Sequence, residues 1–215
     1  MLRAGRQTPG QARALQELWP GFGIEFANSA LDLDAIFGRR APRCLEIGFG
    51  IGEVIGALAQ ARTDVDFLGI EVHRPGVGRL LQHCARANLS NLRIICHDAV
   101  EVLRNGIADG ALNEVLIFFP DPWHKKRHHK RRLIDAQFLA LVSRKMQTGG
   151  ILRMATDWQP YAEQMLRAGN ACEALESLSP DGTFVERYES RSSTRFERRG
   201  ERLGHEVWDL AFRRT

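Results

Sequence analysis

The chain has 215 residues, of which 44% are hydrophobic and 26% are charged, values that are typical of one globular domain. This composition excludes a disordered or fibrous protein, and the close spacing of charged residues excludes a transmembrane helix. The N-terminal residues lack the apolar core of a signal peptide, and none of the four cysteines forms a Cys-x-x-Cys pair. We therefore expect a cytoplasmic protein with reduced thiols.

Residues 1–40 are predicted to form an N-terminal extension with one short helix. Apolar residues recur at helical spacing over residues 11–18, and Trp19-Pro20-Gly21 ends that pattern. The main domain is then expected to cover residues 41–215.

Strands and helices alternate along the main domain. An apolar strand at residues 43–47 runs into a glycine-rich turn, and a helix is expected over residues 53–61. Further strands are predicted at residues 66–71, 92–96, 114–119 and 151–156, with helices near residues 77–84 and 98–103, and a helix that contains Ile134, Phe138, Leu141 and Met146 and ends at Gly149-Gly150. This alternation predicts an α/β fold with a doubly wound, mostly parallel, Rossmann-like sheet. The alternating pattern of residues 206–212 predicts an antiparallel edge strand near the C-terminus.

The positive charge is concentrated in two segments. Residues 124–132 are nine consecutive basic or His residues, six of them Lys or Arg, and residues 191–202 contain five Arg and two Glu. Because the net charge of the whole chain is only +4, the remainder is acidic. Such cationic segments indicate contact with the phosphates of a nucleic acid. A solvated charged surface is the alternative, but it leaves the repulsion between these charges uncompensated.

The turn after the first strand indicates a ligand site. Gly48 and Gly50 let the backbone turn sharply and let a ligand approach the main chain. Glu46 lies two residues before the first glycine. A carboxylate there would repel the pyrophosphate of a dinucleotide, but it suits a cationic ligand without phosphate, such as S-adenosylmethionine.

Two further acids support the same ligand. Glu71 ends the second strand, where a carboxylate can accept hydrogen bonds from both ribose hydroxyls, and Asp98 ends the third strand, where it can accept one from the adenine amine. Each acid alone is equally well explained as a solvated loop residue. Three acids at successive strand ends favour S-adenosylmethionine over NAD.

The segment Pro120-Asp121-Pro122-Trp123 follows the fourth strand, where ligands bind in open α/β sheets. The two prolines stiffen the loop around Asp121, and the aromatic ring offers a stacking surface for a base. This combination is similar to the motif of amino-methylating enzymes, which have Asn or Asp, two prolines and an aromatic residue. A rigid turn with a buried Trp123 is the structural alternative.

Six segments together resemble the bacterial tRNA (guanine-N7-)-methyltransferases over nearly the whole chain. They are Gly5-Arg6-Gln7-Thr8-Pro9-Gly10-Gln11, Leu45-Glu46-Ile47-Gly48-Phe49-Gly50, Gly69-Ile70-Glu71-Val72-His73, Phe119-Pro120-Asp121-Pro122-Trp123-His124-Lys125-Lys126-Arg127-His128, Ala155-Thr156-Asp157-Trp158 and Thr194-Arg195-Phe196-Glu197. The fourth segment is specific to that family, whereas the glycine turn is not. The main departure is the short extension before Gly5, because some members have a longer basic arm.

The resemblance implies methyl transfer from S-adenosylmethionine to guanine N7 in the tRNA variable loop, usually at tRNA position 46, giving 7-methylguanosine and S-adenosylhomocysteine. It implies Asp121 as the catalytic residue. The residues predicted to bind the cofactor are Glu46, Gly48, Gly50, Glu71, Asp98 and Asp121. The residues predicted to bind the tRNA are Lys125, Asp157, Thr194, Arg195, Phe196 and Glu197.

The chemistry of this reaction assigns roles to these groups. Guanine N7 carries no proton, so the attack needs alignment rather than a general base. Positive charge develops on the purine, and Asp121, assisted by Asp157, would stabilise it. Residues 125–132 would hold phosphates, and Trp123, Trp158 or Phe196 would stack on a displaced guanine unless these rings belong to the core.

Other functions are compatible with parts of the sequence. A small-molecule methyltransferase does not need two basic segments, and an NAD oxidoreductase does not fit the glycine spacing. A methyltransferase for another RNA or base atom is separated only by the family resemblance, and a binding module without chemistry is disfavoured by the intact acids. His124 and His128 lack an evident third ligand, so we expect no metal. We also expect no membrane contact and no obligate protein partner.

Overall fold

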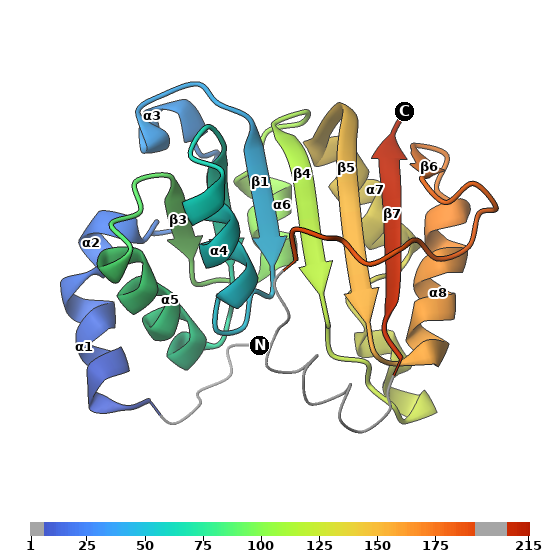
Figure 1. Cartoon of the computed structure of the whole chain (residues 1–215), viewed down its shortest axis with the longest axis horizontal. Coiled ribbons are helices and arrows are strands. Elements are labelled where there is room, and N and C mark those ends of the chain that lie inside the picture. Colours follow the sequence, from blue (N-terminus) through green and yellow to red (C-terminus); the bar gives the residue numbers. More distant parts are fainter. Residues whose placement is uncertain (1–6, 192–205) are drawn as a thin grey trace. The chain divides into compact units, whose positions relative to one another are not determined.

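The structure is a computed structural model that describes residues 7–191 and 206–215. The chain divides into two compact units, Met1–Ala108 and Asp109–Thr215. Both units combine strands with helices that connect them, as Figure 1 shows.

The first unit contains three parallel strands in the order β3-β2-β1. Its strands are β1 (Arg43–Ile47), β2 (Asp66–Ile70) and β3 (Leu92–Ile95), and its connecting helices are α4 (Glu53–Ala61), α5 (Arg74–Arg86) and α6 (Ala99–Asn105). Nearly every strand residue is buried, as is usual for parallel strands covered on both faces. In Figure 1, α4 and α5 lie in front of these strands and α6 lies behind them.

The N-terminal segment packs onto the first unit. Its helices are α1 (Pro9–Glu17), α2 (Trp19–Phe22) and α3 (Leu33–Phe37). One short helix was expected, but Trp19-Pro20-Gly21 begins α2, because proline is tolerated in the first turn of a helix. Thr8 and Gln11 form a capping box at the start of α1, and α1 packs against α5. The Ile24 N–H donates to the Ile94 carbonyl at 2.8 Å, so the segment also runs beside β3. The predicted domain boundary near residue 40 stays a prediction.

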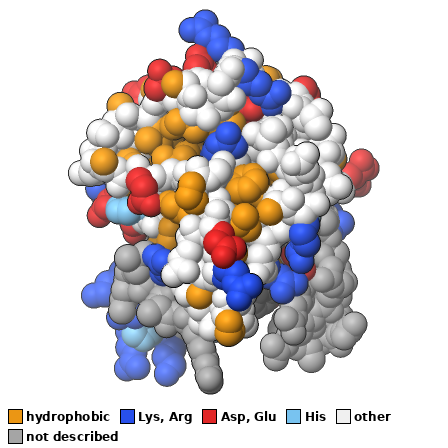
Figure 2. Space-filling model, turned by 90° about the vertical axis from the view of Figure 1, so that its left-hand side faces the viewer, with side chains coloured by type: hydrophobic (Ala, Val, Ile, Leu, Met, Phe, Trp, Pro, Cys, Tyr) orange, Lys and Arg blue, Asp and Glu red, His pale blue; other side chains and the backbone are white. Residues whose placement is uncertain are grey.

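The surface over α1 and α2 is mixed in character. Figure 2 shows hydrophobic side chains interspersed with charged ones on this face, rather than a continuous basic surface. Ala12, Leu15, Trp19 and Phe22 of the two helices, and Leu18 between them, are apolar and partly exposed. The face is therefore unlike the basic segment of residues 124–132.

The second unit has the strand order β4-β5-β7-β6. Its strands are β4 (Leu112–Phe118), β5 (Met146–Thr156), β6 (Leu175–Ser177) and β7 (Trp208–Arg214), and its helices are η1 (Lys126–Arg131), α7 (Ala136–Lys145) and α8 (Gln159–Asn170). β4 and β5 are parallel, whereas β7 is antiparallel to both β5 and β6. The α/β, Rossmann-like fold class with an antiparallel C-terminal strand is confirmed. The short β6 pairs with the outer side of β7, so β6 and not β7 is the outermost strand.

Three local predictions for the second unit were wrong. Ile134 lies before the predicted helix, because α7 begins at Ala136 after its cap Asp135. Met146 is the first residue of β5 and not part of the preceding helix, which ends at Lys145. The pair Gly149-Gly150 lies inside β5, where the register with β4 shifts, and Gly149 has a φ of 82°. The glycines therefore permit an irregularity within a long strand instead of ending a helix.

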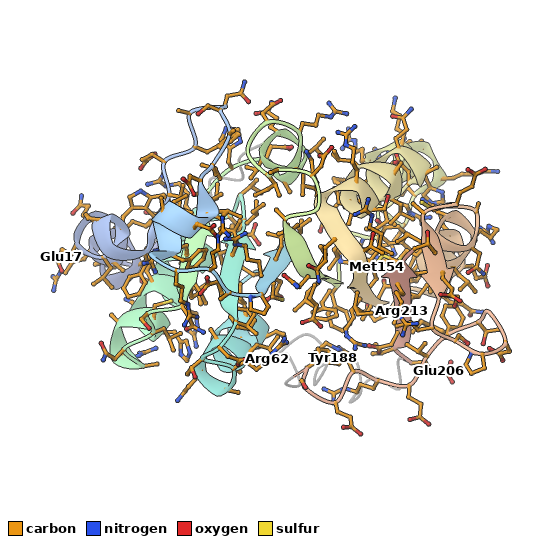
Figure 3. All side chains as sticks on the ribbon, turned by 90° about the horizontal axis from the view of Figure 1, so that it is seen from above. Glu17, Arg62, Met154, Tyr188, Glu206 and Arg213 are labelled. Atoms are coloured by element: carbon orange, nitrogen blue, oxygen red, sulfur yellow. The ribbon has the colours of Figure 1, made fainter. Side chains whose placement is uncertain are left out.

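The segment after β6 covers one face of the second unit. Figures 1 and 3 show it crossing β7 and β5 on the side opposite α7, and Tyr188 is labelled on it in Figure 3. The Arg153 guanidinium of β5 lies 4.1 Å from the centre of the Tyr188 ring. The segment ends among the described residues at Arg191, which is fully buried.

The expectations of reduced thiols and of no transmembrane helix concern the cysteines and the helices of the chain. All four cysteines are free thiols; Cys44 and Cys84 are buried, and Cys96 and Cys172 are partly exposed. None of the described helices is long and apolar enough to cross a bilayer.

Candidate functional site

The turn between β1 and α4 has three glycines in the left-handed region. Gly48, Gly50 and Gly52 have φ values of 73°, 58° and 77°. A side chain at any of them would strain the backbone. A Cβ atom placed on Gly48 or Gly50 would meet no other atom within 4 Å, whereas one on Gly52 would meet the Leu80 side chain at 2.6 Å. Gly52 therefore serves packing, and the first two glycines border open space that a ligand can enter.

Glu71 holds this turn in place. Its Oε2 accepts a hydrogen bond from the Gly50 N–H at 2.8 Å, and its Oε1 accepts from the N–H groups of Val72 and His73 at 2.8 and 2.9 Å. α5 begins next to these groups, and a Cβ on Gly76 would lie 1.9 Å from the Gly50 carbonyl oxygen. The predicted ligand-binding acid thus also determines the shape of the glycine turn.

Glu46 is a buried carboxyl at the end of β1. It is 3% exposed, and among the described residues its Oε2 has no hydrogen-bond partner. Burial raises the pKa of Glu46 to about 8, and the nearby charge of Glu71 adds to the effect, while the Ile55 backbone N–H opposes it. A buried acceptor without a donor is unfavourable in the free protein, and a cationic or hydrogen-bonding ligand would satisfy it.

Asp98 follows β3 and caps α6. Its Oδ1 accepts from the N–H groups of Val100 and Glu101 at 2.9 and 3.2 Å. The cap fixes the carboxylate in direction and leaves Oδ2 for a ligand. Glu46, Gly48, Gly50, Glu71 and Asp98 are thus all placed at the carboxyl ends of β1, β2 and β3, on the first unit.

In the second unit, the turn after β4 carries Asp121. Phe119 and Trp123, the residues just outside the Pro-Asp-Pro sequence, have φ values of 52° and 46°. Bulky residues rarely adopt this conformation, and each such residue costs about 1–3 kcal/mol. The Phe119 N–H donates to the Ala155 carbonyl at 2.8 Å, which ties the start of the turn to β5. Asp121 is exposed at its centre.

Buried arginines support the turn of residues 119–123 at both ends. The Arg191 guanidinium lies 5.3 Å from the ring centres of both Phe118 and Phe119, and its Nη2 donates to both carboxylate oxygens of Asp209. Arg132, which is 5% exposed, donates from Nε to the Pro122 carbonyl at 2.9 Å. The sequence did not reveal these two roles, because both arginines lie in segments that read as basic surface.

The rest of the 124–132 segment is mostly exposed. Lys125 precedes the 3₁₀ helix η1, whose residues Lys126, Arg127 and Lys130 are all exposed. Arg131 lies 5.0 Å from the centre of the Trp123 ring. The segment therefore presents several cations to solvent while Arg132 points inward.

Asp157 follows β5 and is partly exposed. The adjacent Trp158 N–H donates to Thr156 Oγ1 at 3.3 Å, and the His124 ring meets the Trp158 ring edge to face at 4.3 Å between centres. His124 and His128 contact different tryptophans, since His128 lies near Trp123. The remaining predicted tRNA-binding residues, Thr194, Arg195, Phe196 and Glu197, lie outside the described residues.

Two other features bear on where ligands could bind. Within residues 7–191 and 206–215, no three His, Cys, Asp or Glu side chains cluster in a way that would hold a metal ion. A groove of about 460 Å³ is present in the second unit, but none of the predicted site residues lines it. Its lining residues are Ala136, Ala140, Ser143, Arg144, Ala168, Ala171, Cys172, Glu173, Ala174 and Arg214.

Comparison with known sequences gives full-length matches. A family profile described as "Putative methyltransferase" matches residues 40–210. The tRNA (guanine-N(7)-)-methyltransferase of Pseudomonas aeruginosa is 54% identical over 215 residues, which cover 100% of this chain and 88% of the relative. The enzyme with the same name from Shewanella frigidimarina is 51% identical over 215 residues, covering 100% of this chain and 90% of the relative.

Solved structures agree in fold. The 16S rRNA methyltransferase KamB matches with a TM-score of 0.62 at 14% identity, over 86% of this chain and 93% of that chain. The aminoglycoside resistance methyltransferase NpmB1 matches with a TM-score of 0.55 at 16% identity, over 86% and 92% of the two chains. At these identities the likeness supports the fold alone.

The buried Glu46 carboxyl makes stability depend on pH. Its pKa is about 8 in the folded chain against 4.5 for an ordinary Glu, so between these values the folded protein holds a proton that the unfolded chain releases. Stability contributed by the neutral carboxyl is complete below pH 4.5 and is lost as the pH rises to 8. We expect Glu46→Gln to raise the free energy of unfolding at pH 8 by on the order of 4 kcal/mol.

The measurement is urea unfolding of both proteins at pH 4.5, 6 and 8, without added ligand. The increase in the free energy of unfolding caused by Glu46→Gln should grow with pH and should nearly vanish at pH 4.5. Glu17→Gln, which removes an exposed carboxylate from the first unit, is the control. A difference between Glu46→Gln and the wild type that is independent of pH would contradict the assignment.

Proposed function

We propose a specific reaction for this chain, which belongs to the tRNA (guanine-N(7)-)-methyltransferase family. The chain would methylate N7 of the guanine at position 46 in the tRNA variable loop. The product would be 7-methylguanosine, and the methyl donor S-adenosylmethionine would leave as S-adenosylhomocysteine. The observation that carries this proposal is the strained, supported turn that exposes Asp121 immediately before a run of exposed cations. A bacterial enzyme acting on tRNA would work in the cytoplasm.

The first unit fits S-adenosylmethionine. Its open space at Gly48 and Gly50 would accommodate the donor close to the backbone, and the unsatisfied Glu46 carboxyl would face one of its cationic groups. Pairing with a cation would favour the ionised form of Glu46 and offset its burial. When bound, S-adenosylmethionine supplies a methyl group made electrophilic by its sulfonium.

Glu71 and Asp98 would recognise the adenosine part. Glu71 already accepts three backbone N–H groups, which fix its carboxylate, and about one of its four acceptor sites is left for a ribose hydroxyl. Asp98 uses Oδ1 for its helix and would use Oδ2 for the adenine amine. Both acids are thus prepositioned by bonds made within the protein, which limits the entropy lost on binding.

Asp121 and Asp157 would act on the guanine. The N7 lone pair attacks without losing a proton, so the protein must hold the ring in line with the methyl group. A carboxylate of Asp121 that accepts from guanine N1–H and the amino group would select guanine over adenine. The same negative charge would stabilise the positive charge that develops on the ring. Asp157 would assist from the end of β5.

The exposed cations would position the tRNA. Lys125, Lys126, Arg127 and Lys130 would contact phosphates, which fixes register without reading bases. Trp123 already has Arg131 over its ring, and Trp158 already has His124 against it, so stacking of either on guanine would have to use another part of the ring. Phe196, in the 194–197 segment, is the third candidate.

A methyl-transfer assay tests the proposed function. Purified protein, radiolabelled S-adenosylmethionine and unmodified tRNA are incubated, and the product is treated with borohydride and aniline, which cleave at 7-methylguanosine. Cleavage in the variable loop is the expected result. Labelled tRNA without that cleavage would identify a different base or atom, and the absence of label would refute methyl transfer to tRNA.

Replacing Asp121 should impair chemistry more than binding. We expect Asp121→Ala to lower kcat by at least about 100-fold, because charge stabilisation and alignment are lost together. Calorimetry should still detect S-adenosylmethionine binding. Glu173→Ala, which removes an exposed acid elsewhere in the second unit, should turn over normally. Near wild-type kcat in Asp121→Ala would exclude the catalytic role.

The exposed cations should determine the salt dependence of tRNA binding. We expect the triple variant Lys126→Gln, Arg127→Gln and Lys130→Gln to reduce the slope of log Kd against log salt by about 0.7–0.9 for each phosphate that the protein no longer neutralises. The matched control removes three exposed arginines outside the segment: Arg86→Gln, Arg104→Gln and Arg167→Gln. Equal slopes for the wild type and the triple variant would disprove the proposed binding of phosphates by this segment.

A further inference from the structure

We propose that Arg132 is a positioning residue that orients the catalytic turn of residues 119–123, although it belongs to the basic segment. This inference rests on the proposed function, because it concerns how Asp121 is presented to guanine. It separates Arg132 from the neighbouring lysines and arginines, whose exposed charges suit phosphates.

Each nitrogen of the Arg132 guanidinium has a partner within the protein. Nε donates to the Pro122 carbonyl at 2.9 Å, Nη1 donates to Gln164 Oε1 at 2.6 Å, and Nη2 lies 3.1 Å from His129 Nε2. Its flat face lies 4.7 Å from the centre of the Tyr161 ring. All three nitrogens are therefore in use, and the side chain is buried.

Two of the residues that contact Arg132 are held by hydrogen bonds to the backbone of Ile134. Gln164 and Tyr161 both belong to α8, and both bind the backbone of Ile134. Gln164 Nε2 donates to the Ile134 carbonyl at 3.0 Å, and the Ile134 N–H donates to the Tyr161 hydroxyl at 2.9 Å. Tyr161 is fully buried. Arg132 thus connects the Pro122 carbonyl to α8.

This connection matters because the turn is strained. Phe119 and Trp123 are both in the left-handed region, and a strained loop relaxes unless its surroundings hold it. The Pro122 carbonyl belongs to the residue next to Asp121, so losing its bond would release the carboxylate from its direction. Misplacement of a reacting group by about 1 Å can reduce the rate by about 100-fold.

The decisive variant is Arg132→Lys, which keeps the charge but cannot donate to Pro122 and Gln164 at once. We expect kcat for tRNA methylation to fall about 10- to 100-fold. The slope of log Kd against log salt for tRNA should stay at the wild-type value. We also expect faster amide hydrogen exchange over residues 119–125, a readout that does not depend on activity.

Two further variants and one control test this expectation. Gln164→Met removes an acceptor of Arg132 without changing charge, and it should lower kcat in the same direction but less. Arg127→Gln removes an exposed cation of the same segment, and it should raise KM and reduce the salt slope. Arg167→Gln, exposed on α8, is the neutral control and should match the wild type in kcat and in amide exchange.

The outcomes separate this inference from the proposed function. Wild-type kcat in Arg132→Lys, or a lower salt slope with kcat retained, would overturn the positioning role. If Arg132→Lys does not fold, Gln164→Met decides: reduced kcat supports the role, and unchanged kcat overturns it. If the wild type makes no 7-methylguanosine, the proposed function fails. Amide exchange tests the positioning role separately: an unchanged exchange rate over residues 119–125 in Arg132→Lys would show that Arg132 does not support the turn.

Discussion

Left-handed backbone at strand ends is the constraint on which the rest of this structure depends. Parallel strands deliver the chain to their carboxyl ends, where it must reverse sharply while leaving room for ligands. After β1 this is achieved with glycines, which adopt positive φ without steric penalty. After β4 it is achieved with Phe119 and Trp123, for which the same conformation is unfavourable. Glu71 holds the first turn, whose glycines carry no steric penalty, whereas the second turn is strained and is held by Arg132 and Arg191.

The two units also differ in the charges that they carry near these turns. The first unit presents acids at strand ends, and Glu46 is buried so deeply that its neutral form is favoured in the free protein. The second unit uses cations in two ways. Lys126, Arg127 and Lys130 remain in water, where like charges are tolerated until an anion arrives. Arg132 and Arg191 are buried, with aromatic faces and hydrogen-bond acceptors around their guanidinium groups.

Sequence reasoning succeeded where one local signal dominates. The helix over residues 53–61 follows a glycine turn and was predicted with its bounds, as α4. It failed where partners distant in sequence decide: Met146 fits a helical pattern but pairs with Leu112 of β4, and the three residues of β6 are a strand only because β7 lies beside them. The acids at strand ends could be found because parallel strands share one edge. Arg132 could not be distinguished from its neighbours, since its burial depends on α8 and the composition of residues 124–132 is uniformly basic.

The turn after β4 also limits which mutations can stabilise this protein. Placing glycine where the backbone is left-handed removes the steric penalty of the side chain. At residue 119 this route is closed, because the ring that makes the conformation unfavourable is also the surface on which Arg191 packs. Glycine there would relieve the backbone and at the same time uncover a buried charge. We therefore expect few substitutions at residue 119 to stabilise the protein.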